Sequence, residues 1–352
     1  MTLMGKKGYV FWLVVWLSAT LLYVCWLRGL VPQVFHGTAP AWFTAIVDWT
    51  YPRFGVEKHR FELAFFVRHA DQIVIRLGLV NAAALALVVT ASRRPAIRDY
   101  WAGFWNLRVS AARMRFYRVF FYAGILFFTY DWHIDLADLH RAAAFYQPVP
   151  LLRLLRLPFP PPWVSGLLCG LLVASTLLVV SGFQKILFST VAAVLFTLLQ
   201  GWLFSFEKVD HAFAPMTYAL WLMPLVLRQH QKNEPMWALQ LLRLAIGLVY
   251  LQAGLEKLLV GGWEWLSPDT FRNYLYLHPT ALGGWVAAQN WLCVVLPLGA
   301  LLFQLGFVSV VFAPRLRWVF LPAGVLFHAG TYALMHVGGY MNAWVWLYAF
   351  FI

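Results

Sequence analysis

Three polar side chains recur at seven-residue intervals within one apolar segment, Met236–Trp265. Arg243, Tyr250 and Lys257 would lie on one face of a helix, because spacings of three, four and seven residues return to the same side. The segment is long enough to cross a bilayer, which takes about 20 apolar residues. A charge at that depth costs at least about 2.5 kcal/mol, so it usually faces protein or water and marks a functional site.

Lys257 is the candidate catalytic group of this segment. A lysine amine that is withdrawn from water loses much of its preference for the charged form and can act as a general base near neutral pH. The alternative is that Lys257 lies at the helix end and extends its amine to the membrane surface, since Trp263 and Trp265 follow in the manner of an interfacial belt. The sequence leaves both readings open.

A second polar cluster precedes another expected span. Glu207, Lys208, Asp210 and His211 lie within five positions, and His211 beside Asp210 could orient a substrate or carry a proton. The expected topology brings this cluster and Lys257 to the outer half of the membrane. Ordinary charges at the level of the lipid headgroups are the alternative interpretation.

A third polar stripe, His328, Tyr332 and His336, has members four residues apart. Two histidines eight residues apart lie about 12 Å from each other along a helix, so this pair alone cannot ligate one metal ion. We expect the stripe to face a cavity or to form interhelical hydrogen bonds, and we predict no metal site. Gly254, between Tyr250 and Lys257, would let a neighbouring helix approach closely.

The amino-acid composition indicates what kind of elements position these residues. The chain of 352 residues is 62% hydrophobic and 12% charged, whereas soluble domains carry about 25% charged residues. We therefore predict an all-α, polytopic integral membrane protein with eight to ten transmembrane helices, surrounded by membrane lipids. The net charge of +13 is not a nucleic-acid signal here, because basic residues of membrane proteins collect on cytoplasmic loops and near anionic lipid.

Seven arginines between Ser92 and Arg118 place that segment, and hence the N-terminus, in the cytoplasm, most simply at a bacterial cytoplasmic membrane. An outer loop is expected over 261–285. The first apolar run is too long for a signal peptide and is expected to remain as a helix. The expected spans are 10–30, 72–91, 117–132, 163–182, 186–206, 215–227, 236–265, 288–311, 319–336 and 342–352.

Several function classes lack their signatures. Cys25, Cys169 and Cys293 lie in or beside apolar runs without a CxxC pattern, so we expect free packed thiols. The chain has no phosphate loop, HExxH or GxSxG element. It also lacks the repeated histidine pairs of a multihaem cytochrome and the intramembrane acids of a proton pump. Paired broken helices, as in many transporters, are not evident either.

Five segments together resemble a known family. VYLQAGLEKLLVGGW (249–263) resembles the signature helix of the HTTM (horizontally transferred transmembrane) domain proteins, which are vitamin K-dependent gamma-carboxylase-like membrane proteins. RMRFYRVFFYAGILFFTYDW resembles the family's opening helix, and FYQPVP the loop after it. DHAFAPMTYAL resembles the polar entry to a later span, and LFHAGTYALMHVGGYMNAWVW the closing histidine-bearing helix. The resemblance assigns 107–352 to this domain and 1–106 to an added helical pair with an amphipathic outer loop.

The resemblance implies a reaction. In the eukaryotic carboxylase, a lysine of the signature helix deprotonates vitamin K hydroquinone, and the matching residue here is Lys257. The family's histidine at the entry to the later span matches His211. A quinone or hydroquinone would then be bound by Tyr250, Gly254, His328 and Tyr332. Glu256 replaces the first of two adjacent lysines and no segment matches the large luminal domain, so peptide glutamate carboxylation is not expected.

The leading hypothesis is a carboxylase-like enzyme that uses Lys257 as a base on a quinone or another lipid-soluble small molecule. The alternative is a non-catalytic subunit or assembly partner of a larger membrane-protein complex, which the aromatic-rich surface would suit. A small-molecule transporter is a weaker third hypothesis.

Overall fold

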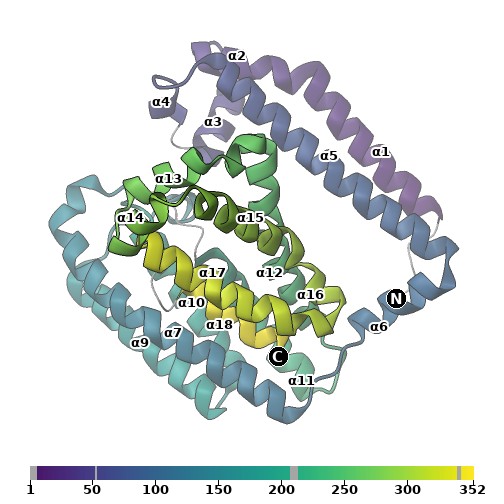
Figure 1. Cartoon of the computed structure of the whole chain (residues 1–352), viewed down its shortest axis with the longest axis vertical. Coiled ribbons are helices and arrows are strands. Elements are labelled where there is room, and N and C mark those ends of the chain that lie inside the picture. The colour runs from purple at the N-terminus through teal and green to yellow at the C-terminus, as the bar shows by residue number, and fades with distance from the viewer. Residues whose placement is uncertain (1–5, 52–53, 207–212, 339–341) are drawn as a thin grey trace. The chain divides into compact units, whose positions relative to one another are not determined.

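The computed structural model describes residues 6–51, 54–206, 213–338 and 342–352. The chain divides into two compact units, residues 1–104 and 105–352. Every regular element among the described residues is a helix, which confirms the predicted all-α class (Figure 1).

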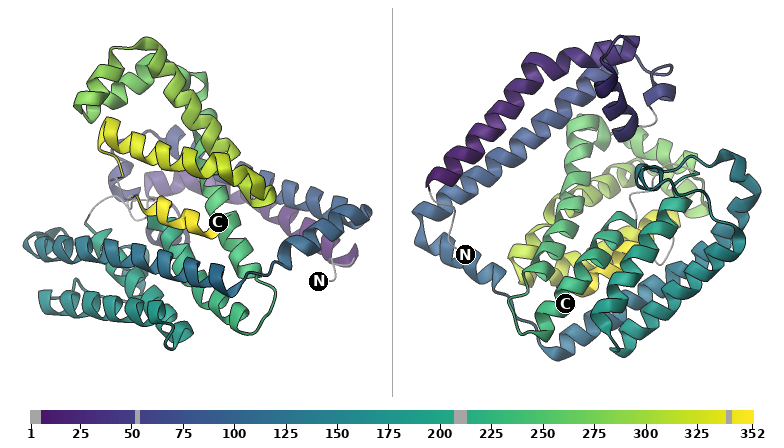
Figure 2. Two further views of the ribbon diagram at one scale, coloured as in Figure 1. Left: turned by 60° about the horizontal axis from the view of Figure 1, so that its bottom comes forward. Right: turned by 180° about the vertical axis from the view of Figure 1, so that it is seen from behind.

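The first unit is built around two long helices that lie side by side (Figures 1 and 2). One is continuous through three segments, α1 (Lys6–Leu22), the π-helical turn η1 (Tyr23–Leu27) and α2 (Arg28–His36). The other is α5 (Leu63–Arg93). The expected loop between them contains two short helices, α3 (Ala41–Thr50) and α4 (Phe54–Glu57). Helix α6 (Pro95–Trp105) follows α5.

Hydrogen bonds between the two long helices pair the charged side chains Arg28 and Asp71. Asp71 of α5 accepts hydrogen bonds from Arg28 Nε at 2.9 Å and from the Tyr23 hydroxyl at 2.9 Å. An acid paired in this way is tolerated in or near a membrane far better than an isolated one. This pair therefore serves the packing of the first unit.

The second unit contains the remaining long helices and several short ones. Its longer helices are α7 (Ala111–Leu139), α9 (Pro162–Ser181), α10 (Lys185–Leu203), α11 (Ala214–Gln231), α12 (Trp237–Glu256), α15 (Asn290–Gly306) and α17 (Arg317–Met335). Its shorter elements are η2 (His140–Phe145), α8 (Pro150–Leu154), η4 (Lys257–Gly261), η5 (Gly262–Leu266), α13 (Pro268–Leu277), α14 (Ala281–Ala287), α16 (Ser309–Phe312), η6 (Pro314–Leu316), α18 (Ala343–Leu347) and η7 (Tyr348–Phe351).

Local sequence determines several of these helix ends. Ser110 caps α7 by accepting a hydrogen bond from the backbone N–H of Arg113. Pro162 occupies the first position of α9, where a missing N–H costs nothing. Gly182 ends α9 with φ +91°, a left-handed conformation that glycine adopts without strain.

Consecutive helices of the second unit pack against each other from α9 to α12, with α7 against α9 and α15 against α12. The last segment, α18 and η7, lies in the interior and contacts α7, α11, α12 and α17. Of its residues, Ala343, Trp344 and the run Leu347–Phe351 are buried. The sequence predicted only a final short span here, and the structure instead makes this segment part of the core.

Six helical segments of the described residues are long and apolar enough to cross a membrane. They are Leu13–His36, Pro162–Ser181, Lys185–Leu203, Trp237–Leu266, Asn290–Phe312 and Pro314–Met335. This finding confirms an integral, polytopic membrane protein. The expected second, third and sixth spans fall in α5, α7 and α11, and the larger number of eight to ten spans stays a prediction.

The segment predicted as an outer loop, 261–285, is helical instead. Pro268 begins α13, and Thr280 caps α14 by accepting a hydrogen bond from Gly283 N–H. Leu275 of α13 and Val286 of α14 are buried in one small apolar cluster with Cys293. This segment mostly connects two candidate spans, as predicted, but its helices were not predicted, because they obtain their stability from packing, which residue spacing alone does not reveal.

Candidate functional site

Helix α12 carries the predicted polar stripe, and the structure places its members in different environments. Tyr250 is buried, whereas Arg243 and Lys257 are half-buried. Lys257 lies seven residues beyond Tyr250, which is about 10 Å along a helix. The stripe therefore comprises three local sites rather than one.

The Lys257 side chain lies where α12 changes into the π-helical turn η4. Its Nζ donates to the Ala253 carbonyl at 3.3 Å and lies 5.0 Å from the ring centroid of Trp265. Among the described residues, no carboxylate lies within ion-pair distance of Nζ. The ammonium is thus partly shielded from water and keeps N–H donors to spare.

Trp265 adds a second donor at the same place. Its indole Nε1 is buried and has no hydrogen-bond partner among the described residues. Buried donors are nearly always paired in native proteins, because an unpaired one costs about 1–3 kcal/mol. An acceptor in the plane of the indole ring would satisfy this N–H, and a second acceptor above the ring face would satisfy the free donors of Lys257. Two donors beside an aromatic ring fit the oxygen and the ring of a quinone or phenol.

Tyr250 and His328, both predicted to bind a quinone, are joined directly. The Tyr250 hydroxyl lies 2.7 Å from His328 Nε2 and 2.6 Å from the Tyr348 hydroxyl. All three side chains are buried, so helices α12 and α17 and the last segment meet in one polar cluster. Two hydroxyls and an imidazole in sequence can donate, accept and pass a proton. The sequence analysis missed Tyr348. It lies four residues after Trp344, and this helical spacing, which places both side chains on one face, was the signal that could have indicated it.

Gly254 serves close helix packing in the structure. A Cβ atom at this position would lie 2.8 Å from Leu305 Cδ2 and 3.2 Å from the Leu305 backbone nitrogen of α15. This close approach agrees with the expectation that Gly254 lets a neighbouring helix come near. The space beside Gly254 is filled by Leu305 of α15. Contact of Gly254 with a quinone stays a prediction.

Gly254→Leu should destabilise the protein by about 1–3 kcal/mol, because the added side chain overpacks the α12–α15 contact. Thermal unfolding can be followed with a thiol-reactive dye, since Cys169 and Cys293 are buried and become reactive on unfolding. A Cys25→Ser background removes the exposed thiol. Gly299→Leu on α15 is the matched control, because nothing lies within 4 Å of its Cβ position. Equal melting temperatures for both variants would contradict the assigned contact.

The remaining predicted site residues lie elsewhere. Tyr332 contacts the ring of His336, with centroids 5.5 Å apart, one turn beyond His328 on α17. His211 and its neighbours Lys208 and Asp210 lie outside the described residues. Within the described part of the chain, no three His, Cys, Asp or Glu side chains are grouped closely enough to hold a metal ion.

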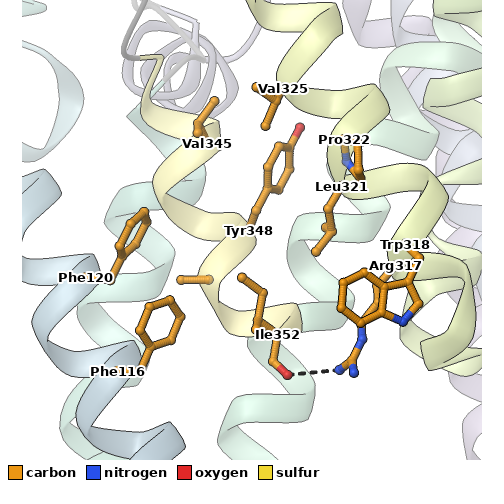
Figure 3. Close-up of a pocket in the computed structure, with 11 residues that line it drawn as sticks. Phe116, Phe120, Arg317, Trp318, Leu321, Pro322, Val325, Val345, Tyr348 and Ile352 are labelled. Atoms are coloured by element: carbon orange, nitrogen blue, oxygen red, sulfur yellow. Dashed lines mark hydrogen bonds between the residues drawn. The ribbon is translucent and has the colours of Figure 1, made fainter.

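A cavity of about 370 Å³ lies between α7, α17 and the last segment. Its wall is almost entirely apolar and includes Phe116, Phe120, Arg317, Trp318, Val325 and Tyr348. Figure 3 shows Arg317 and Trp318 at one end of this cavity and Val325 at the other. The volume is within the range of about 300–1,000 Å³ that small-molecule sites occupy.

Comparison with known proteins identifies part of the chain. Residues 221–352 match the family model of the HTTM domain. The match begins within α11 and includes Lys257, Tyr250 and His328, so the resemblance to this family is confirmed over that range. No curated protein and no solved structure matches the chain. The chain is therefore an all-α integral membrane protein whose residues 221–352 match the HTTM domain family.

Proposed function

We propose that the HTTM domain acts on a quinone-like, lipid-soluble substrate and that Lys257 is its general base. The observation that carries the proposal is the pair of neighbouring donors, Lys257 Nζ, which has one acceptor in the Ala253 carbonyl and N–H groups to spare, and the buried Nε1–H of Trp265, which has no described acceptor. A reduced quinone has an aromatic ring and an acidic hydroxyl, which match the Trp265 face and the two donors. The resemblance to the carboxylase-like family favours the same substrate class.

In the proposed step, neutral Lys257 Nζ accepts the proton of the substrate hydroxyl and becomes an ammonium group. The Trp265 ring favours this product, because a cation above an aromatic face is stabilised by about 0.5–2 kcal/mol. Trp265 Nε1–H, in the plane of the indole ring, donates to the second oxygen of the substrate. The deprotonated substrate is the reductant that then reacts with molecular oxygen, which supplies the oxygen atoms and accepts the electrons.

The other predicted residues have supporting roles in this proposal. Tyr250 and His328 bond each other inside the protein and fix α12 against α17, one to two turns from Lys257. Direct contact of a quinone with Tyr250, His328 or Tyr332 stays a prediction. A proton-transfer role for His211 is likewise a proposal from the resemblance alone.

Lys257→Arg is the sharpest test, because it keeps the positive charge and the hydrogen-bonding capacity and removes a titratable amine. Purified protein in liposomes would receive a reduced short-chain naphthoquinone, and quinone absorbance and oxygen uptake would be recorded. We expect both Lys257→Arg and Lys257→Ala to lower turnover by about 10²–10⁴-fold, the usual contribution of a general base. Lys232→Ala, in a surface turn, is the matched lysine control.

Trp265→Phe separates the two donors. It retains an aromatic face and removes the indole N–H, so substrate affinity should fall more than the rate of proton transfer. Unaltered turnover in Lys257→Arg would overturn the base assignment. A wild-type protein without quinone-dependent turnover that is always recovered in a stoichiometric membrane complex would favour the non-catalytic subunit.

A further inference from the structure

The apolar cavity between α7 and α17 has a strongly basic end. Arg317 lines the cavity, and Arg113 lies three residues before the lining residue Phe116 on α7. Residues three apart on a helix share a face, so Arg113 is adjacent to the cavity mouth. Arg315 is exposed, two residues before Arg317. The guanidinium groups of Arg113 and Arg317 therefore lie at one end of a hydrocarbon-lined space.

No aspartate or glutamate of the described residues neutralises these charges. Among the described residues, no ion pair involves Arg113, Arg315 or Arg317. The charges of Arg113 and Arg317 also act on Arg243, so positive groups at this end repel one another. Arg317 donates from Nη1 to the backbone carbonyls of Phe351 and Ile352, while its Nη2 and Nε have no described partner. An anion at this end would relieve the repulsion and accept these donors.

The apolar wall of the cavity is open to a lipid environment both at the basic end and at the Val325 end. Trp318 is 74% exposed, Val325 43% and Phe116 40%, although all three are apolar and lie on membrane-protein helices. The predicted topology places the first turns of α7 and α17 at the cytoplasmic surface, where anionic lipid headgroups attract basic residues. A molecule with hydrocarbon chains and an anionic head matches both ends at once.

We propose that this cavity binds an anionic phospholipid, with one acyl chain along Phe116, Phe120 and Val325 and the phosphate at Arg113 and Arg317. The site is distinct from the Lys257 site. Arg243, which feels the charges at the basic end, lies fourteen residues from Lys257, about 21 Å along α12. The inference is independent of the proposed reaction.

The test uses the purified full chain in neutral detergent, with phosphatidylglycerol and phosphatidylcholine of identical acyl chains as probes. Native mass spectrometry would measure how many molecules of each lipid are retained. We expect one phosphatidylglycerol to be retained in preference to phosphatidylcholine. Arg113→Gln should reduce that preference about fivefold, the contribution of one basic residue at an anionic lipid surface, and leave phosphatidylcholine retention unchanged.

Val325→Phe fills the cavity and should lower retention of both lipids at least tenfold. Val319→Phe, at an exposed position of the same helix outside the cavity wall, and Arg228→Gln, an exposed arginine on α11, are the matched controls. Equal retention of the two lipids by the wild-type protein, or full retention by Val325→Phe, would overturn the proposal. Displacement of phosphatidylglycerol by an equimolar uncharged quinone would assign the cavity to a quinone instead.

Discussion

Tyr250→Phe should be among the most destabilising single-atom changes in this protein. The lost hydroxyl bonds two partners in the interior, His328 Nε2 at 2.7 Å and the Tyr348 hydroxyl at 2.6 Å. Interhelical hydrogen bonds in membrane proteins contribute about 0.6–1.7 kcal/mol each, and the variant loses two of them. Both partners also become unsatisfied inside an apolar core. We expect a loss of about 2–3 kcal/mol, measured as a lower thermal midpoint with the thiol-reactive dye.

The Tyr348→Phe variant supplies the internal comparison. It removes one hydroxyl and leaves the bond between Tyr250 and His328, so its cost should be about half that of Tyr250→Phe. In the double variant, the two costs should not add, because Tyr348 has already lost its partner when Tyr250 is replaced. Additive costs, or a larger cost for Tyr348→Phe, would show that the hydroxyls do not form one connected cluster.

The polar cluster shows what the sequence could and could not predict. Spacing placed Tyr250 and His328 on separate helices and marked both as interior, and the structure joins them. Their pairing could not be predicted, because it depends on how α12 and α17 are arranged around the last segment. That segment was predicted to be a final span, although its burial places Tyr348 between the two helices. The local sequence pattern predicts that a helix forms. It does not predict which residues of two helices touch, because that depends on how the helices pack.

The Lys257 site differs from its prediction for a similar reason. Trp265 was interpreted as an interfacial belt residue eight positions from Lys257, a spacing close to two helical turns. Between them the chain forms a π-helical turn and a 3₁₀ turn, and Gly262 adopts φ +55°. These irregular turns bring the indole ring under the ammonium. A regular helical period cannot anticipate such a local change, although the glycine pair 261–262 marks where it occurs.

Arg243→Met should release the last segment from the core of the HTTM domain. Arg243 Nε donates to the Phe350 carbonyl at 2.6 Å, and its other nitrogens donate to Gln240 Oε1 at 3.2 Å and the Tyr117 hydroxyl at 3.3 Å. Phe350 is in η7, whose final carbonyls have no intrahelical donors. Away from water, a backbone carbonyl without a donor costs several kcal/mol. The guanidinium therefore supplies the hydrogen-bond donor that water would supply at the end of a solvent-exposed helix.

Two effects oppose each other in this variant. Removing a buried charge that has no described carboxylate partner relieves a desolvation cost, and apolar replacements of buried charges are sometimes stabilising. Against this, three acceptors lose their donor, at about 1–3 kcal/mol each. The lost donors, above all the one to the Phe350 carbonyl of η7, outweigh one relieved charge. We therefore expect a local effect, seen as faster backbone hydrogen exchange in residues 343–352, together with a lower thermal midpoint.

Two further variants separate the charge of Arg243 from its geometry. Arg243→Lys keeps the charge but cannot reach three acceptors with one ammonium, so hydrogen exchange in 343–352 should rise to an intermediate level. Tyr117→Phe removes only the weakest of the three contacts and keeps the ring packed against Phe350, so it should change little. Wild-type exchange in Arg243→Met would mean that η7 holds its place by apolar packing alone. Wild-type exchange in Arg243→Lys would mean that charge, and not the fork of donors, anchors the segment.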